Sequence, residues 1–330
     1  MNNDVVFEIL LHLPVRSLLR FIGVCKLWCN TIDSPHFKKL HSLRRTNNED
    51  EEVYLRFNFD FDYGQIRINI RDNGKSLKSH HFLPMDIRVS GAVKGLVCFS
   101  SPRGMLDIAI CNPFLGQFKY LPLSPYFSTH GSHGQLFHGY NVGLGFDDDY
   151  KVVQLLPCSC LEHRNLHAYL YSARTNSWSE LCLDQDLVIE NPVRSLCKDG
   201  SFAHWEGRNT SGEKIILSFD MKKEVFGTIT IPDGQVFDHT FDFFGILAKG
   251  ECSFVIFFLD TFVLKVYEWS GEGGKLIWNN VDNVVLKNGK SNQVIWYDSR
   301  ARKFIRLFKM YGSSILKHDL IEYEGSLISP

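Results

Sequence analysis

The sequence lacks the features that would take a chain across a membrane or out of the cell. No apolar run approaches the ~20 residues that cross a bilayer, and the opening MNNDVVFE carries acid where a secretory signal carries base. Nine cysteines, an odd number without regular spacing, do not make a disulfide framework. We therefore expect a chain of the cytosol or nucleus, without a membrane partner.

The sequence also lacks an excess of either charge. Lys and Arg number 36 and Asp and Glu 37, so no global field favours nucleic acid as a partner. The charges are unevenly placed, because residues 1–45 hold seven basic residues against three acidic ones. This distribution predicts an acidic partner for the N-terminal segment.

Few clusters suggest catalysis or a metal. The stretch CSCLEHRNLH holds Cys158, Cys160, His163 and His167, whose sulfur and imidazole ligands could build a zinc site. Their spacing is not a standard one, and a surface loop is the favoured interpretation. Residues 130–140, HGSHGQLFHGY, offer three histidines without a nearby acid or nucleophile. We expect no catalytic residues and no cofactor.

The glycines of VGLGFDD, residues 142–148, match a dinucleotide-binding loop only in part. The stretch lacks the third glycine of that motif and a helix after it, so we do not expect it to bind a nucleotide.

Residues 4–41 are dense in leucine at helical spacing, with breaks at Pro14 and Ser34-Pro35, and predict three or four short helices. The first helix should place on one face Val5, Val6, Ile9, Leu10 and Leu13. The third helical stretch should turn inward Val24, Leu27, Trp28 and Ile32. Sixteen of the 24 residues from 5 to 28 are apolar, more than so small a bundle can enclose. The surplus must be covered by another protein or by the rest of the same chain.

From residue 53 onward the apolar period changes from 3.6 to 2, as in FNFDFDY, and no long amphipathic helix appears. Short strand candidates alternate with Gly, Pro, Asn and Asp clusters, so the body is predicted to be all-β. One hairpin pattern recurs with the same offset, at 111–118, 171–178, 219–226 and 297–304, and a stretched fifth copy is expected from Tyr267 to Trp278. We expect an irregular β-propeller, with a pair of β-sandwiches as the second choice.

The string DVVFEILLHLPVRSLLRFIGVCKLWCNTIDSPHFKKLH, residues 4–41, resembles the F-box of plant F-box proteins, notably at residues 13–18 and 25–28. The resemblance implies a helical module that binds the acidic Skp-type adaptor of cullin-RING ubiquitin ligases. The residues expected to contact the adaptor are Val6, Ile9, Leu10, Pro14, Leu18, Leu19, Val24 and Trp28. The family usually has a Leu-Pro dipeptide ahead of this helix, where Met1-Asn2-Asn3 stands here, which predicts weaker adaptor binding or a truncated start.

The body carries a second resemblance. The stretches GAVKGLVCFS, ICNPFLGQFKYLP, VGLGFDDDYKVVQL and EYEGSLISP are similar to signatures of the F-box-associated, kelch-like domain of plant F-box proteins. Their order is similar to the S-locus F-box group, which recognises secreted ribonucleases. We expect an F-box over residues 1–44, a linker over 45–53 and the β domain over 54–330.

Together these resemblances imply a non-catalytic substrate-recognition subunit of an SCF-type ubiquitin ligase. The Skp adaptor would link the chain to the cullin and RING subunits, and the β domain would hold a protein target that no sequence pattern identifies. Two alternatives stay open: a propeller hydrolase or lectin-like binding protein with bracing N-terminal helices, and a scaffold that binds no adaptor.

Overall fold

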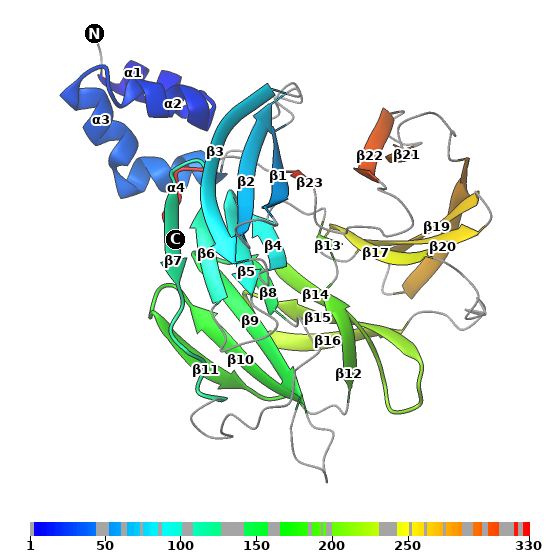
Figure 1. Ribbon diagram of the computed structural model, residues 1–330. Coiled ribbons are helices and arrows are strands. Elements are labelled where there is room, and N and C mark those ends of the chain that lie inside the picture. The colour runs from blue at the N-terminus through cyan, green and yellow to red at the C-terminus, as the bar shows by residue number, and fades with distance from the viewer. Residues whose placement is uncertain are drawn as a thin grey trace. The chain divides into compact units, whose positions relative to one another are not determined.

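The structure is a computed structural model, shown in Figure 1. It describes residues 3–43, 53–60, 65–72, 75–84, 88–100, 108–126, 142–157, 166–183, 187–192, 194–195, 200–230, 243–250, 253–260, 263–272, 275–285, 293–298, 303–309, 320–322 and 326–330.

Four short helices open the chain, which agrees with the prediction of three or four. They are α1 (Asn3–Leu11), α2 (Val15–Phe21), α3 (Lys26–Asp33) and α4 (Pro35–Leu43). Pro14 is the N-cap of α2, where its fixed φ suits a helix start. Ser34 caps α4, because its Oγ accepts the N–H of Phe37 at 3.2 Å. Of the described helices, none is long and apolar enough to cross a membrane.

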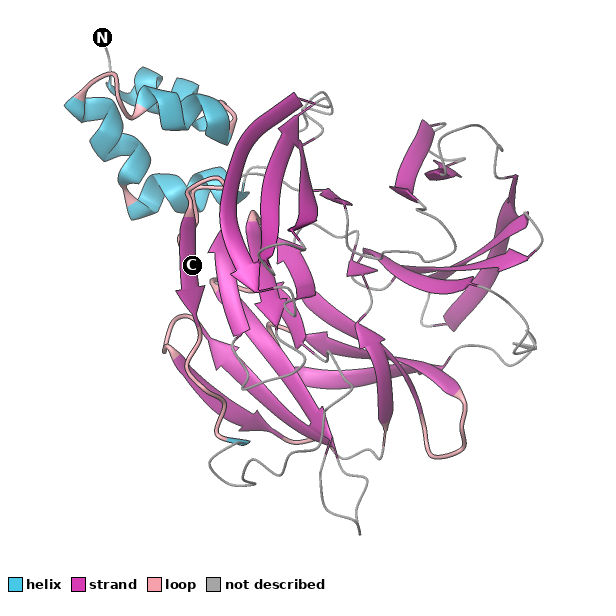
Figure 2. Cartoon of the chain, in the orientation of Figure 1, coloured by secondary structure: helices cyan, strands magenta, loops and turns pink. Residues whose placement is uncertain are grey.

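The rest of the described chain is built of sheets, as Figure 2 shows. Three four-stranded antiparallel sheets follow each other along the chain from residue 88 to residue 230. Their strands are β4 (Arg88–Val93), β5 (Leu96–Ser100), β6 (Ile108–Asn112) and β7 (Gln117–Tyr120); β8 (Val142–Phe146), β9 (Tyr150–Pro157), β10 (Leu166–Ser172) and β11 (Ser177–Leu181); and β12 (Val188–Pro192), β14 (Phe202–Arg208), β15 (Lys214–Asp220) and β16 (Val225–Thr230).

The remaining sheets are less regular. One antiparallel sheet joins the two ends of the β region, with β23 (Leu320–Glu322) pairing with β1 (Val53–Asp60), followed by β2 (Gln65–Asp72) and β3 (Lys75–Pro84). A five-stranded sheet holds β13 (Arg194–Ser195), β17 (Phe243–Gly250), β18 (Ser253–Asp260), β19 (Val263–Glu272) and β20 (Lys275–Val285), with β13 parallel to β17. The last pair is β21 (Gln293–Asp298) and β22 (Lys303–Lys309).

The four helices followed by a succession of antiparallel sheets confirm the predicted fold, a helical module ahead of an irregular propeller-like β domain. The chain divides into two compact units, a first unit of residues 1–122 and 318–330 and a second unit of residues 123–317. The boundaries predicted for F-box and linker stay a prediction, because residues 44–52 lie outside the described residues.

The predicted hairpin repeat is confirmed by the strand register. Cys111 pairs with Phe118, Tyr171 with Trp178, Phe219 with Phe226 and Tyr297 with Phe304. The stretched fifth copy is shifted, because Trp278 pairs with Trp269 whereas Tyr267 pairs with Asn280. The register is constant from the pair Tyr267–Asn280 to the pair Glu272–Lys275, so Trp278 meets the residue two positions after Tyr267.

The turns of three of these hairpins share one backbone conformation. The residue before the second strand has a positive φ in each, at Gly116, Asn176 and Glu224. Asn112 and Asp220 begin their turns in the same way, since one side-chain oxygen accepts the backbone N–H groups two and three residues on. A common turn geometry therefore sets the common register.

The glycines of β8 are packing residues. A Cβ on Gly143 would stand 2.6 Å from Cζ2 of Trp205 and 2.7 Å from Cβ of Ala203, and a Cβ on Gly145 would collide with Met221. These neighbours belong to β14 and to the turn after β15. The absence of side chains on β8 thus lets two sheets of the second unit approach closely.

Candidate functional site

The helical module has a tightly packed interior. The fully buried side chains of Leu10, Leu18, Ile32 and Phe37 lie in its core. Phe7 packs edge-on against Phe37, with ring centroids 5.3 Å apart. The helices therefore have a packed core before any partner binds, and that core also includes residues of the β4–β7 sheet.

A buried histidine connects the last helix of the module to the turn between the first two helices by a hydrogen bond. The ring of His41 on α4 is buried, and its Nε2 donates a hydrogen bond to the carbonyl oxygen of Leu13 at 2.9 Å. Leu13 lies in the turn between α1 and α2, so this bond closes the helical module on itself.

Four large apolar side chains of the module remain exposed to about half of their surface. Val5 and Ile9, one turn apart on α1, are each 51% exposed, while Val24 and Leu27, just before and within α3, are 58% and 48% exposed. Figure 1 shows α1, α2 and α3 as consecutive arms of this module. We call these residues the two exposed pairs. Their burial against a partner would stabilise a complex by roughly 3–6 kcal/mol, at about half the full contribution of each side chain.

The residues predicted to contact an adaptor fall into three groups. Val6, Leu10 and Leu18 are buried in the protein's own core, at 6%, 1% and 0% exposure. Pro14, Leu19 and Trp28 are partly buried, and Leu19 and Trp28 pack on that core. Ile9 and Val24 are exposed. Adaptor contact by this set stays a prediction.

Two expectations about helix faces are wrong. Val5 and Ile9 do not share a buried face with Val6 and Leu10, because a helix that is apolar nearly all round can turn only one side to its core. Val24 and Leu27 do not point inward either, since Ile32 and the partly buried Trp28 supply the buried side of α3. Val5 and Leu27 are not among the residues predicted to contact an adaptor. Their spacing from Ile9 and Val24, of four and three residues, is the sequence signal that would have added them.

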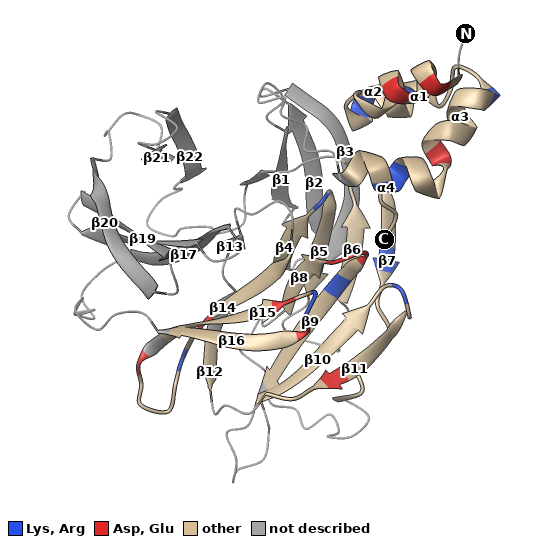
Figure 3. Cartoon of the chain, turned by 180° about the vertical axis from the view of Figure 1, so that it is seen from behind, with Lys and Arg blue, Asp and Glu red and all other residues tan. Residues whose placement is uncertain are grey.

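Charged residues lie on the same helices, and Figure 3 colours their positions along the chain. Arg20, Lys26 and Lys39 are exposed, and Lys38 pairs with Asp33. Basic residues therefore lie on α2, α3 and α4 of the module that also carries the two exposed pairs. Such a surface suits a partner that is apolar with an acidic border.

Most of the candidate metal ligands lie outside the residues that the structure describes. Cys158, Cys160 and His163 lie outside the described residues, as do the three histidines of 130–140. His167 lies on β10, with Nδ1 3.8 Å from Oε1 of Glu180. Within the described ranges, no three His, Cys, Asp or Glu side chains gather to hold a metal ion. The zinc site stays a prediction.

Three buried titratable groups are held in their neutral forms. Burial raises the pKa of the Cys98 thiol far above its usual range and that of Cys111 to about 12, so both are protonated packing residues at neutral pH. Burial also lowers the pKa of His204 to about 4, and its Nδ1 lies 2.8 Å from Oγ of Ser218.

A four-helix module with exposed apolar side chains, ahead of repeated antiparallel sheets, defines a protein with a helical module joined to a propeller-like β domain. The family described as the F-box domain matches residues 1–40, and the family described as the F-box associated beta propeller domain matches residues 66–251, more than half of the chain. The chain belongs to the family of F-box proteins with an F-box associated beta propeller domain. The two family matches confirm the resemblance to plant F-box proteins, but they do not show membership of the S-locus group.

Relatives in Arabidopsis thaliana carry F-box protein names. One, named as a putative F-box protein, is 23% identical over 257 residues, which cover 72% of this chain and 65% of the relative. A second of that name is 24% identical over 93% of this chain and 80% of its own length. A third, named as an F-box protein, is 24% identical over 80% of this chain and 70% of its own length.

Solved structures resemble the chain only distantly. A fucose-specific lectin from Aleuria aurantia is 11% identical, with a TM-score of 0.40, over 78% of this chain and 91% of the lectin. A prolyl endopeptidase is 12% identical, with a TM-score of 0.42, over 78% of this chain and 38% of the enzyme. At these TM-scores no argument about lectin or hydrolase activity follows.

Proposed function

We propose that the chain is the substrate-recognition subunit of an SCF-type cullin-RING ubiquitin ligase. The helical module binds a Skp-type adaptor, which links the chain to the cullin and RING subunits, and the β domain binds a target protein. This chain carries out no chemistry itself. It raises the effective concentration of target lysines near the ubiquitin donor.

The observation that carries the proposal is the pair of exposed apolar surfaces on an otherwise well-packed helical module of the F-box family. Val5, Ile9, Val24 and Leu27 are about half exposed although the same module fully buries Leu18 and Ile32. The module thus has a completed core and, separately, apolar side chains available to a partner. The exposed basic residues beside them favour an adaptor with acidic groups at the border.

The test is co-expression of the full chain with a Skp adaptor, followed by size-exclusion chromatography. A stoichiometric complex is expected for the wild type. Ile9→Asp and Leu27→Asp should each weaken adaptor binding at least about tenfold, because each places a charge in a desolvated apolar contact. Leu18→Asp is unsuitable, since Leu18 is fully buried and its replacement would unfold the module.

Matched controls lie in the second unit. Val188 and Val225 are 50% and 53% exposed, so Val188→Asp and Val225→Asp repeat the chemical change outside the helical module. They should leave adaptor binding unchanged. Equal binding by Ile9→Asp, Leu27→Asp and the wild type would reject the two exposed pairs as the adaptor surface, and absence of any wild-type complex would reject the proposed function.

The proposal also includes a location and a target class. The chain acts in the cytosol or the nucleus. The similarity to the S-locus group predicts a secreted ribonuclease as the target and a role in self-incompatibility. Affinity purification of the full chain after proteasome inhibition tests this narrower prediction by identifying the captured protein.

A further inference from the structure

The last five residues of the chain are held as an ordered segment within the first unit. Leu327 is 3% exposed and Ser326 is 6% exposed, while Ser329 is exposed. We call residues 326–330 the C-terminal segment. Its place beside the β4–β7 sheet follows from its contacts with Asn112, the last residue of β6, and with Gly95, in the turn before β5.

Asn112 binds this segment with its side-chain amide. The fully buried Nδ2 donates to the carbonyl oxygens of Ser326 at 2.9 Å and Ile328 at 2.8 Å. The Oδ1 accepts the N–H groups of Phe114 and Leu115, at 3.0 and 3.2 Å. The amide orientation is therefore unambiguous, because only the nitrogen can serve the two carbonyls.

The turn between β4 and β5 approaches the same segment closely. Gly95 has φ +75°, and a Cβ built on it would stand 2.6 Å from the backbone nitrogen of Ser326. Lys94 also has a positive φ, and Val93 pairs with Leu96, so Lys94-Gly95 forms a two-residue hairpin turn of the I′ kind. Glycine at this position leaves room for the backbone of the segment.

Leu327 is the buried apolar residue of the segment. It belongs to one cluster of buried side chains that contains residues of the helical module and of the β4–β7 sheet. The helical members are Val6, Leu10, Leu11, Val15, Leu18, Ile32 and Phe37, and the sheet members are Val97, Phe99, Ala109, Cys111 and Phe114. The core of the helical module is thus continuous with that of the sheet and includes a residue from the far end of the sequence.

We propose that the C-terminal segment is a clamp that couples the helical module to the β4–β7 sheet, so that the clamp supports the adaptor-binding conformation of the helices. The part that concerns the adaptor rests on the proposed function. By thermodynamic reciprocity, adaptor binding in turn stabilises the segment. The clamp also holds the adaptor-binding helices and the first part of the β domain as one body.

Two equivalent turns of the hairpin repeat provide a variant that tests the clamp and a matched control. Asn112→Asp keeps the oxygen that caps the turn, as Asp220 does in the equivalent turn, but it removes the N–H donors and sets a carboxylate against two carbonyl oxygens. Asp220→Asn makes the reverse change in a turn that caps itself in the same way. Leu327→Ala and Leu217→Ala form a second pair, because Leu217 is fully buried in a cluster of the second unit.

The first measurement is amide hydrogen exchange of α1–α4 in the full chain, followed by mass spectrometry, which needs no adaptor. Asn112→Asp and Leu327→Ala should accelerate exchange in the helices by about tenfold or more, whereas Asp220→Asn and Leu217→Ala should not. Unchanged helical exchange in both clamp variants would overturn the coupling. If the variants fail to fold, a chain that lacks only residues 329–330 and one that lacks 326–330 give the same comparison.

The second measurement is the dissociation constant for the Skp adaptor. Asn112→Asp should raise it about tenfold, and adaptor binding to the wild type should slow exchange in residues 326–330. Faster helical exchange with unchanged affinity would overturn the role of the clamp in adaptor binding. A wild type that binds no adaptor would instead reject the proposed function, while the exchange result would still decide the coupling.

Discussion

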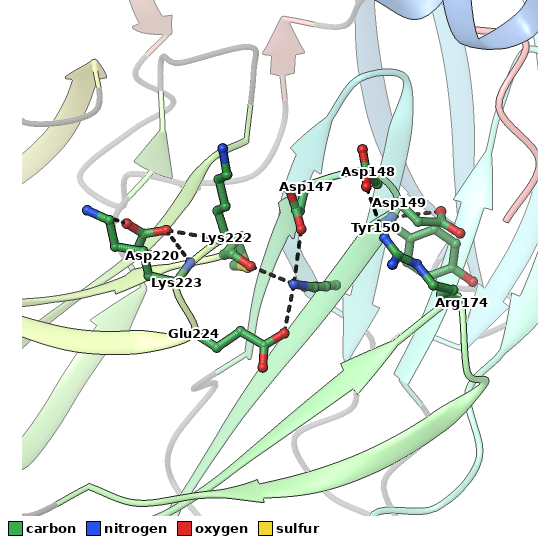
Figure 4. Close-up of polar contacts among 11 residues, drawn as sticks. Asp147, Asp148, Asp149, Tyr150, Arg174, Asp220, Lys222, Lys223 and Glu224 are labelled. Carbon is green, nitrogen blue, oxygen red and sulfur yellow. Dashed lines mark hydrogen bonds and ion pairs between the residues drawn. The ribbon is translucent and has the colours of Figure 1, made fainter.

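The buried Nζ of Lys151 donates a hydrogen bond to Oε1 of Glu224 at 2.8 Å, although Glu224 has a backbone φ of +57° that glutamate rarely adopts. The same ammonium group donates to the carbonyl oxygen of Met221 at 2.6 Å and reaches Oδ2 of Asp147 at 3.4 Å. Figure 4 shows Asp147 and Glu224, from the turns of two different sheets, converging on one nitrogen. The ion pair thus explains a strained residue where the equivalent turns have Gly116 and Asn176.

Removal of the lysine should destabilise the second unit. Lys151→Met leaves the Met221 carbonyl and two carboxylates without their donor, and we expect a loss of about 1–3 kcal/mol in the free energy of unfolding. The loss is moderated because Glu224 and Asp147 are partly exposed, at 47% and 26% of their side chains. Urea denaturation monitored by tryptophan fluorescence measures it, and Lys222→Met, at an exposed position nearby, is the control.

The backbone strain of Glu224 makes a separate prediction. Glu224→Ala loses the ion pair and keeps an unfavourable positive φ, whereas Glu224→Gly loses the ion pair but relieves the strain. We expect the glycine variant to be more stable than the alanine variant by about 1 kcal/mol. Equal unfolding midpoints would show that the left-handed conformation carries no such cost.

The hairpins show how much of the fold the sequence contains. The pairing of Tyr171 with Trp178 and of Phe219 with Phe226 was predictable, because a polar turn of fixed length between an apolar strand end and an aromatic residue leaves one register. The contact of Asn112 with Ser326 could not be predicted, because the two residues are 214 positions apart and no local pattern links them.

The helical module shows the same limit at the candidate site. Helix number followed from spacing and from Pro14, which ends one helix and starts the next. The sequence did not show which residues are exposed, because Val5, Val6, Ile9 and Leu10 are all apolar. Only the three-dimensional packing decides which of them faces the core. A surplus of apolar residues therefore predicts that a partner surface exists without locating it.

The close approach at β8 predicts unequal effects of two similar substitutions. Gly143→Ala forces a Cβ against the rigid, fully buried Trp205 and should cost about 1–3 kcal/mol. Gly145→Ala meets the flexible Met221 side chain and should cost less. Gly227→Ala, where no atom lies within 4 Å, should change stability by no more than about 0.5 kcal/mol. Thermal unfolding of the three variants measures the order, and equal losses would contradict it.

The buried His204 predicts a defined pH dependence. Burial lowers its pKa from the ordinary value of 6.5 to about 4, so the unfolded chain takes up a proton at higher pH than the folded one. The stabilisation is therefore fully present above pH 6.5 and is lost as the pH falls towards 4, by up to about 3 kcal/mol. Denaturation of the wild type and of His204→Gln between pH 7.5 and 4 measures it, and parallel curves would exclude this histidine as a source.

The cysteines predict a pattern of thiol reactivity. Cys98 and Cys111 are buried and their raised pKa values keep them protonated; at pH 8, a pKa of about 12 leaves about one Cys111 thiol in ten thousand ionised. Iodoacetamide should therefore modify the exposed Cys25 and Cys182 in the native chain but spare the buried pair, as peptide mapping by mass spectrometry would show. Because Cys111 belongs to the cluster shared by the helices and the β4–β7 sheet, Leu18→Ala should make it reactive, whereas the same change at the exposed Ile9 should not. Protection of Cys111 in the Leu18→Ala variant would show that the helices open without disturbing the sheet.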